Sequence, residues 1–266
     1  MTLRAALLAL CLAASVAQAH DSWLAPKAGS TFELATGNRY PVQEFGVSPS
    51  SVLQSACRDA QGKPLPLRAS REHPKWLEMR AARQPLACWA ELRAADIAIE
   101  PPLVAVYLAE IRASRANRER WAALLAEGIP WRETYRKFAR IEVAPEFATR
   151  DAIAAARRPV GLALELVVLG SEPIAVGQPV QFQLLRDGHP LAGLPVELVS
   201  ERSAIGIWRE TDSQGRLTLA LPFAGKWLLR ATDLRVSQDR DSAWESRFVT
   251  LAFEALPVRK RISPVD

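Results

Sequence analysis

The chain has 266 residues, and its 34 lysine and arginine residues against 29 aspartate and glutamate residues give a formal net charge of +5. This length suits two modest domains, or one domain with a long insertion. The basic residues are scattered, and runs such as residues 112–120 are typical of a solvated helix face without interleaved aromatic residues, which argues against a nucleic-acid-binding protein.

Residues 1–19 have the composition of a secretory signal peptide. A short basic start at Arg4 precedes an apolar run, and residues 17–19 supply small side chains at the two positions that a signal peptidase reads. The apolar run is too short to span a bilayer comfortably, which disfavours the alternative of a retained membrane anchor. We therefore expect a periplasmic protein that does not itself span a membrane and in which His20 is the first residue.

Residues 20–100 predict an N-terminal β domain. Short alternating segments such as residues 31–37 are separated by prolines and turn residues, as in a β-sandwich. Cys57 and Cys88 fall in two of these expected strands. In an oxidising compartment a disulfide between them is favoured, and the alternative of two reduced thiols binding a metal is weakened by their wide spacing.

Residues 101–158 predict a helical insert and a connector. The pair Pro101-Pro102 opens a segment in which Val104, Leu108 and Ile111 follow helical spacing. Gly128 is expected to end a helix, and residues 130–138 (PWRETYRKF) are expected to form another short helix that begins at a proline. The connector that follows, near residue 150, also has some helix potential.

Residues 159–256 return to regular strands, and residues 257–266 form a tail. In the stretch TDSQGRLTLAL, Gly215 follows an aspartate-led turn, and alternation buries Leu217, Leu219 and Leu221 on one face. This stretch resembles transthyretin-like and collagen-adhesin B-type sandwich domains. The expected fold class is mainly β, with two β-sandwich (Ig-like or transthyretin-like) domains and a helical insert between them.

Several separated segments resemble one family in the same order. They are HDSWLAP at the expected mature start, VYLAE, RETYRKFAR, LALELVVL, GHPLAGLPVEL, TDSQGRLTLALPFAGKWLLRATDL and WESRFVTLAF. Together they resemble the bacterial periplasmic proteins grouped as domain of unknown function 4198. That family is often labelled a periplasmic component of cobalt or nickel uptake. The resemblance implies a protein that handles a transition metal, with an inner-membrane metal permease or an outer-membrane receptor as its partner.

The resemblance also marks Asp233 as a candidate ligand, because we expect many relatives to carry histidine at this position in the ATDLR stretch. A carboxylate in place of an imidazole weakens a preference for nickel or copper. The choice among nickel, cobalt and copper therefore stays open.

A free amino terminus at His20 would place an α-amine and the ring nitrogen Nδ1 in one residue, where both can bind the same metal ion. This arrangement resembles the histidine brace of copper-binding periplasmic proteins and polysaccharide monooxygenases. His73 is the better candidate for a third nitrogen, because His189 is expected to be a solvated turn residue. Asp21 would add an oxygen or orient the ring. The candidate metal ligands are therefore His20, Asp21, His73 and Asp233.

These residues favour a non-enzymatic metal-binding protein that is accessory to metal uptake. The alternative is a non-metal module of the cell envelope that binds a protein or a carbohydrate through its loops. A brace-type copper oxidase ranks last, and the sequence has no nucleophile elbow, phosphate-binding glycine loop or HExxH helix. We therefore expect no enzymatic activity.

Overall fold

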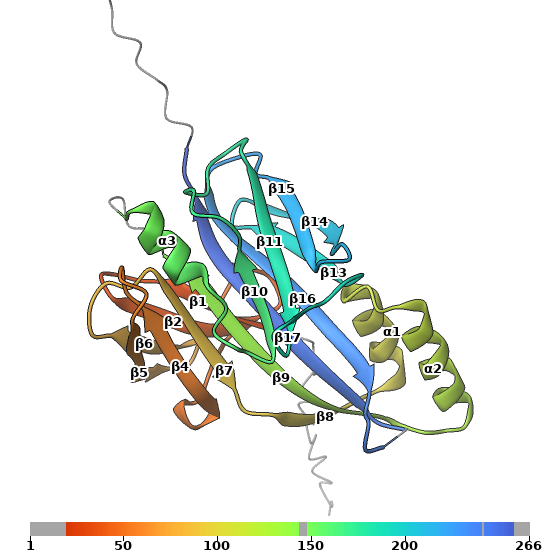
Figure 1. Cartoon of the computed structure of the whole chain (residues 1–266). Helices are drawn as coiled ribbons and strands as arrows, with labels where there is room; N and C mark the ends of the chain where they lie inside the picture. The colour runs from red at the N-terminus through yellow and green to blue at the C-terminus, as the bar shows by residue number, and fades with distance from the viewer. Residues whose placement is uncertain (1–19, 144–147, 241, 258–266) are drawn as a thin grey trace, which may run out of the picture.

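A computed structural model describes residues 20–143, 148–240 and 242–257, and it is built mainly of β-strands, as predicted (Figure 1). The expected signal peptide and the end of the tail lie outside the described residues. Within those residues, no helix is long and apolar enough to cross a membrane.

The first part of the chain forms eight strands, in good agreement with the predicted segments. Their bounds are β1 (Asp21–Pro26), β2 (Thr31–Gly37), β3 (Phe45–Gly46), β4 (Val52–Arg58), β5 (Pro64–His73), β6 (Trp76–Ala81), β7 (Ala87–Leu92) and β8 (Ala95–Ile99). A short 3-10 helix, Pro49–Ser51, lies between β3 and β4.

The rest of the chain forms three helices and nine further strands. The helices are α1 (Pro101–Glu110), α2 (Arg115–Ala126) and α3 (Arg150–Arg157). The strands are β9 (Trp131–Glu142), β10 (Leu164–Val168), β11 (Pro179–Arg186), β12 (His189–Pro190), β13 (Pro195–Ser200), β14 (Ser203–Glu210), β15 (Arg216–Ala220), β16 (Gly225–Val236) and β17 (Trp244–Ala255).

One 13-stranded sheet joins strands from both predicted β domains. Its main path runs β1-β2-β6-β5-β4-β7-β9-β17-β16-β13-β14, with β3 paired to β2 and β8 paired to β9. At the junction, β9 pairs antiparallel with β7 and parallel with β17. The sheet curls back on itself, because the hydroxyl of Thr250 on β17 donates a 2.6 Å hydrogen bond to the carbonyl of Ser22 on β1.

A 4-stranded sheet of β10, β11, β12 and β15 covers the long strands β16 and β17 and completes a sandwich (Figure 1). The predicted alternation in β15 is confirmed, because Leu217, Leu219 and Leu221 are all buried in the core between the two sheets. Gly215 has a φ of +66°, and a Cβ at this position would lie 2.5 Å from the carbonyl oxygen of Leu184. The turn before β15 therefore requires glycine.

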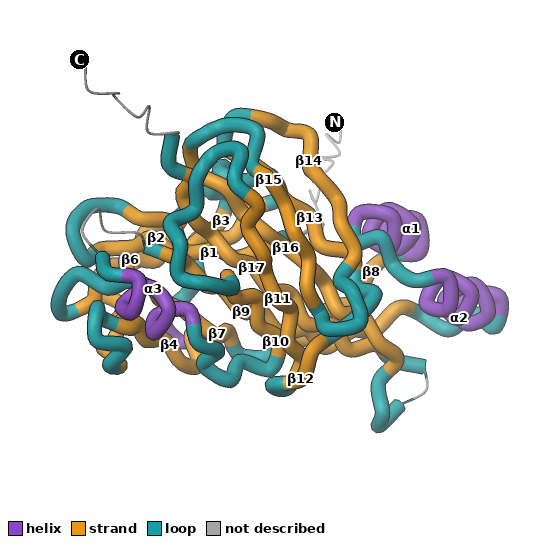
Figure 2. Tube along the Cα trace, turned by 45° about the horizontal axis from the view of Figure 1, so that its top comes forward, coloured by secondary structure: helices purple, strands orange, loops and turns teal. Residues whose placement is uncertain are grey.

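The predicted helical segment is confirmed at α1 and α2, which pack against one end of the large sheet (Figure 2). Gly128 follows α2 with a φ of +74°, and its amide and that of Ile129 donate hydrogen bonds to the last-turn carbonyls. This is the helix stop that the sequence predicts. The helix potential of the connector is also confirmed, by α3.

The prediction of a helix over residues 130–138 was wrong. These residues lie in or directly before β9, which runs through the middle of the large sheet. The sheet supplies β9 with hydrogen-bonding partners on both sides, and this tertiary context overrides the helical propensity of the segment.

The predicted disulfide is confirmed. Cys57 on β4 and Cys88 on β7 lie directly opposite each other in the antiparallel pair, and their sulfur atoms are bonded. Both residues are completely buried, so the bond links the two strands from within the N-terminal core.

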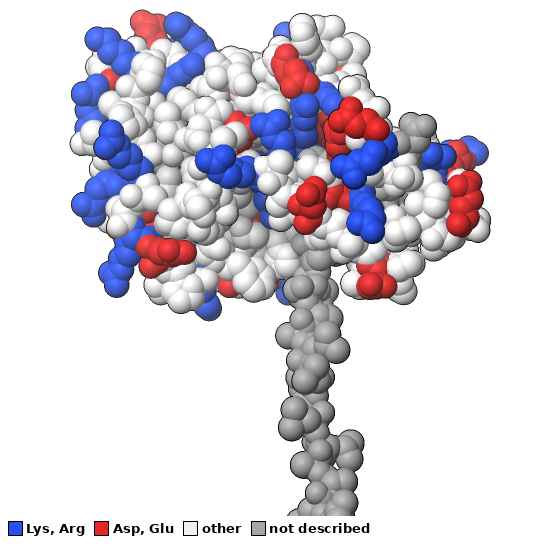
Figure 3. Space-filling view, turned by 90° about the horizontal axis from the view of Figure 1, so that it is seen from below, with Lys and Arg blue, Asp and Glu red and all other residues white. Residues whose placement is uncertain are grey.

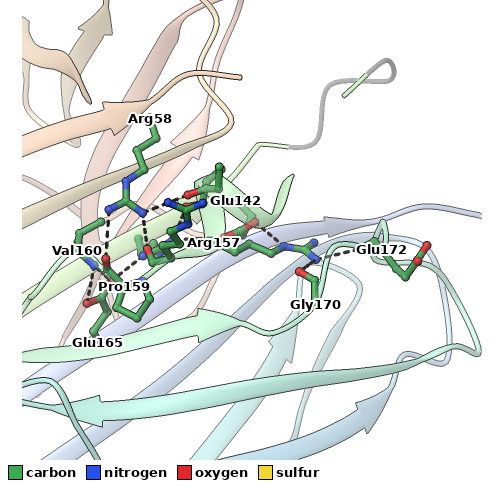
Figure 4. Close-up of polar contacts among 12 residues, drawn as sticks. Arg58, Glu142, Arg157, Pro159, Val160, Glu165, Gly170 and Glu172 are labelled. Carbon is green, nitrogen blue, oxygen red and sulfur yellow. Dashed lines mark hydrogen bonds and ion pairs between the residues drawn. The ribbon is translucent and has the colours of Figure 1, made fainter. Parts of the chain in front are cut away.

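Arginine side chains attach the connector to the sheets (Figure 4). Arg58 on β4 donates hydrogen bonds to backbone carbonyls at and after the end of α3. Arg157 on α3 donates to Glu142 at 3.1 Å. Arg140 on β9 pairs with Glu165 on β10 at 2.6 Å, and both are 1% exposed. Together these hydrogen bonds and ion pairs, of which the Arg140–Glu165 pair is completely buried, hold the connector between the two parts of the molecule.

Charged residues of both signs lie on the surface. On the face in Figure 3, lysine and arginine side chains follow the edge at the left of the view, and both signs are intermixed elsewhere.

Candidate functional site

A cleft of about 430 Å³ begins at His20 and runs between β1, β3, β8 and β9, and we call it the His20 cleft. Its polar lining includes His20, Ser22, Thr36, Glu133, Tyr135 and Lys137. Its apolar lining includes Phe45, Leu92, Ile97, Ile99 and Phe248. A polar set that converges inside an apolar wall is typical of small-molecule sites.

His20 lies just before β1, and its ring is held on two sides. Nε2 lies 3.3 Å from Oε2 of Glu44, which also accepts a hydrogen bond from the amide of Asn38. The ring of Phe45 packs edge-on against the imidazole, with 5.1 Å between the centroids. These contacts fix the orientation of the imidazole ring, which lies at the mouth of the cleft.

Strand β1 places its side chains on alternating sides, because successive residues of a strand point in opposite directions. Ser22 lines the His20 cleft and shares a 2.7 Å hydrogen bond with Thr36. Asp21 instead accepts a 2.7 Å hydrogen bond from Arg230, which also contacts Glu197, and these residues line a second cleft of about 400 Å³. His20 and Asp21, the first two residues of the expected mature chain, therefore line different clefts.

Strand β9 presents every second side chain to the His20 cleft, namely Glu133, Tyr135 and Lys137. Trp131 precedes them in the same alternation and is completely buried beneath α1 and α2. This series explains why the strand was missed in the sequence, because its inward face is polar where a strand pattern requires apolar residues.

Glu133 is buried, and protein groups occupy both of its carboxylate oxygens. Oε1 accepts a 3.0 Å hydrogen bond from the hydroxyl of Tyr107 and a short one from Ser246, and Oε2 accepts a 2.9 Å bond from the Trp131 indole. Burial raises the pKa of Glu133, and these three hydrogen bonds oppose that rise. These hydrogen bonds hold the carboxylate of Glu133 in one orientation in the wall of the cleft.

Lys137 is partly buried in the same cleft. Its Nζ lies 5.3 Å from the ring centroid of Tyr135 and 6.0 Å from that of Phe248. Burial lowers the pKa of Lys137 from 10.5 to about 8, while the carboxylate of Asp21 opposes this change. A cation over two aromatic rings, in a site that disfavours its charge, is a candidate ligand-binding group.

The structure places His73 at the end of β5, where the chain turns into β6. Its ring stacks on Trp76 with 3.6 Å between the centroids, and its Nδ1 accepts a hydrogen bond from the amide of Lys75. The carbonyl of His73 lies against Gly46 on β3, where a Cβ would not fit. His73 therefore contacts the strand that carries Phe45, but it does not line the His20 cleft.

Asp233 lies on β16 between two arginines. Its carboxylate is 3.1 Å from Arg186 and 3.0 Å from Arg235. Burial raises the pKa of Asp233, and the charges of Arg186 and Arg247 oppose that rise. His189 is exposed at the β11–β12 turn, as predicted.

The four predicted metal ligands are thus not gathered at one point. Among residues 20–143, 148–240 and 242–257, no group of three or more histidine, cysteine, aspartate or glutamate residues could hold a metal ion. His20 lies at the cleft, whereas Asp21 and Asp233 are paired with arginines. Their role as ligands stays a prediction.

The cleft-facing part of β9 also falls in the segment that is shared with other proteins. Residues 126–233 match the family model Domain of unknown function (DUF4198). This match supports the family resemblance over a segment that includes β9 and Asp233 but not His20. The label of nickel or cobalt uptake and the transthyretin-like character of the C-terminal strands stay predictions. No curated protein and no solved structure matches the chain significantly.

Three residues of this site were not predicted from the sequence: Glu44, Glu133 and Lys137. The alternation of glutamate, tyrosine and lysine in the DUF4198 segment RETYRKF was the available signal for the last two. Glu44 gave no signal, because its relation to His20 depends on the pairing of β2 with β1 and β3.

Proposed function

We propose that this is a periplasmic protein that binds nickel, cobalt or copper through its mature N-terminal residue and is accessory to metal uptake, without enzymatic activity. The terminal amine and Nδ1 of His20 would bind the ion together. The sequence features that support export are the basic start, the apolar run and the small residues before His20.

The observation that carries the proposal is the contact of 3.3 Å between Nε2 of His20 and the carboxylate of Glu44. Histidines that bind metals commonly donate their other ring N–H to a carboxylate, which fixes the tautomer and the ring orientation. With Nε2 directed at Glu44, Nδ1 is the ring nitrogen that binds the ion. Nδ1 is also the nitrogen that can close a chelate ring with the amine of the same residue.

The other predicted ligands do not complete this donor set. Asp21 and Asp233 contact arginines, and Nδ1 of His73 accepts a backbone hydrogen bond. The remaining coordination positions would be filled by water or by a ligand from solution. Such an incomplete site suits a protein that passes its metal on to a partner, for which an inner-membrane permease or an outer-membrane receptor is the candidate.

The proposal is tested by comparing two proteins, one that begins at His20 and one that retains Ala19. Calorimetric titration with Ni(II), Co(II) and Cu(II) should give an affinity for at least one ion that is tenfold or more weaker when Ala19 is present, in line with the loss of a ligand. The affinity should also fall as pH drops from about 8 to 5, because the amine and the imidazole must lose their protons to bind.

Equal affinity in the two proteins would remove the terminal amine from the site. Absence of binding in both would overturn the proposal and favour an interaction module that binds a protein or a carbohydrate.

A further inference from the structure

The charges in the His20 cleft are unbalanced. Glu133 is the one carboxylate among the described residues that line it, and both of its oxygens accept hydrogen bonds from Tyr107, Ser246 and Trp131. The cations in the same lining are Lys137 and, at the rim, Arg93, whose Nε donates to the carbonyl of Ser50. The cleft therefore contains more cationic than anionic side chains, and its one carboxylate is already bonded to protein groups.

Lys137 is the cation inside the cleft, where it lacks a paired carboxylate among the described residues. Across the described parts of the chain, no carboxylate lies within ion-pair distance of its Nζ, and Nζ donates no hydrogen bond to another side chain or carbonyl. Its neighbours are the rings of Tyr135 and Phe248. Asp21 acts on it only through longer-range attraction and is itself bonded to Arg230. An ammonium group with three donors in such a place has unused hydrogen-bonding capacity.

The wall of the cleft is apolar. Phe248 on β17 is paired with Lys137, and Leu92 on β7 follows the Glu91–Phe138 pair, so both line the cleft near Lys137. Ile97 and Ile99 on β8 line it farther along β9, opposite Glu133 and Trp131. Its volume of about 430 Å³ lies in the lower part of the range for small-molecule sites. The cleft thus combines one cationic point with an apolar surface large enough for an aromatic ring or a short alkyl chain.

We propose that the His20 cleft binds a small organic acid, whose carboxylate pairs with Nζ of Lys137 and whose apolar body packs against Phe248 and Leu92. A carboxylate there would make charge-assisted hydrogen bonds with Nζ, which are stronger than neutral ones, and the apolar part would be removed from water. His20 lines the same cleft, but the acid would use none of the donor atoms of the proposed metal chelate, so the proposal does not depend on metal binding.

Phenylacetate and hexanoate are suitable probes, since each joins one carboxylate to a small apolar group. Calorimetry with protein that has been stripped of metal by a chelator separates this proposal from the proposed metal binding. We expect the wild-type protein to bind at least one of the two acids. The neutral amide phenylacetamide, which has nearly the same shape as phenylacetate, should bind at least tenfold more weakly.

The variant Lys137→Met should lower the affinity for the bound acid at least tenfold, whereas Lys137→Arg, which keeps the charge, should retain most of it. The matched control is Lys226→Met, because Lys226 is an exposed lysine outside the cleft. Circular dichroism would establish that each variant is folded. Failure of both acids to bind wild-type protein would overturn the proposal, as would unchanged affinity in folded Lys137→Met protein. Neither result would bear on the metal titration.

Discussion

Lys137 offers a sharp test of the physical account of the cleft, because a partly buried ammonium group without an ion-pair partner destabilises the folded state. We expect Lys137→Met to increase the free energy of unfolding at pH 7. The pKa of Lys137 falls from 10.5 to about 8 in the folded protein, which corresponds to about 3 kcal/mol as an upper limit. Lys137 is only partly buried, so solvent screening reduces the expected gain to about 1–2 kcal/mol.

The pH dependence follows from the direction of this pKa change. The folded protein binds fewer protons at Lys137 than the unfolded chain between about pH 8 and pH 10.5, so the contribution of Lys137 to stability rises with pH through this window. The advantage of Lys137→Met over wild type should therefore be largest below pH 8 and should shrink toward pH 10.5.

Urea unfolding of wild-type and Lys137→Met protein at pH 7 and pH 10 measures this difference directly. Subtracting wild type cancels the titration of the other tyrosines and lysines. The Lys226→Met variant should match wild type at both pH values, because Lys226 is exposed. A difference between Lys137→Met and wild type that is the same at both pH values would refute the assigned burial of the ammonium group.

Three further variants test other parts of the structure. Replacing Cys57 and Cys88 together by alanine should lower the unfolding free energy by about 3–4 kcal/mol, because the disulfide closes a loop with a sequence separation of 31, and urea unfolding checks this. Glu44→Gln should weaken metal binding by the N-terminal histidine about tenfold or more in a competition titration, since the imidazole loses its carboxylate partner. Arg140→Met should cost about 3–5 kcal/mol in urea unfolding, because it leaves the charge of Glu165 buried without a cationic partner.

Each of these expectations has its own control. The double variant Arg140→Met/Glu165→Gln should recover much of the loss, because glutamine removes the buried charge and its amide oxygen can still accept from the amides of Val160 and Gly161. A double variant as unstable as Arg140→Met would contradict the buried ion pair. For Glu44→Gln, an unchanged metal affinity would show that this carboxylate does not orient the imidazole. Oxidised wild-type protein that is no more stable than its reduced form would refute the disulfide estimate.

The elements that could be predicted from the sequence are those whose signals are local. Alternation with buried leucines marked β15, and Gly215 marked the turn before it. The two prolines and the apolar spacing marked α1, and Gly128 marked the end of α2. In each case a pattern within a short segment of the sequence was enough to predict the element that the structure contains.

Strand β9 was mispredicted because its inward face serves the cleft rather than the core. Glu133, Tyr135 and Lys137 occupy positions where a strand buried on that face would carry apolar residues. Local rules fail most often at functional or strained sites, where a residue is kept for reasons other than folding. The failure at β9 is therefore itself consistent with a functional cleft.

The candidate site was predicted only in part, because its geometry depends on strand pairing. His20 was identified from the expected cleavage position, but its partner Glu44 lies after β2 and reaches it only through the sheet. Asp21 and Asp233 were plausible ligands as carboxylates, yet the fold places an arginine beside each of them. A single sequence does not show which cation lies beside a given carboxylate.

The most direct test of the proposed metal chelate is the first residue of the exported protein. Intact-mass measurement and N-terminal sequencing of protein purified from the periplasm should show a chain that begins at His20. A chain that begins at any other residue would contradict the account, because the α-amine and the imidazole would no longer belong to the same terminal residue.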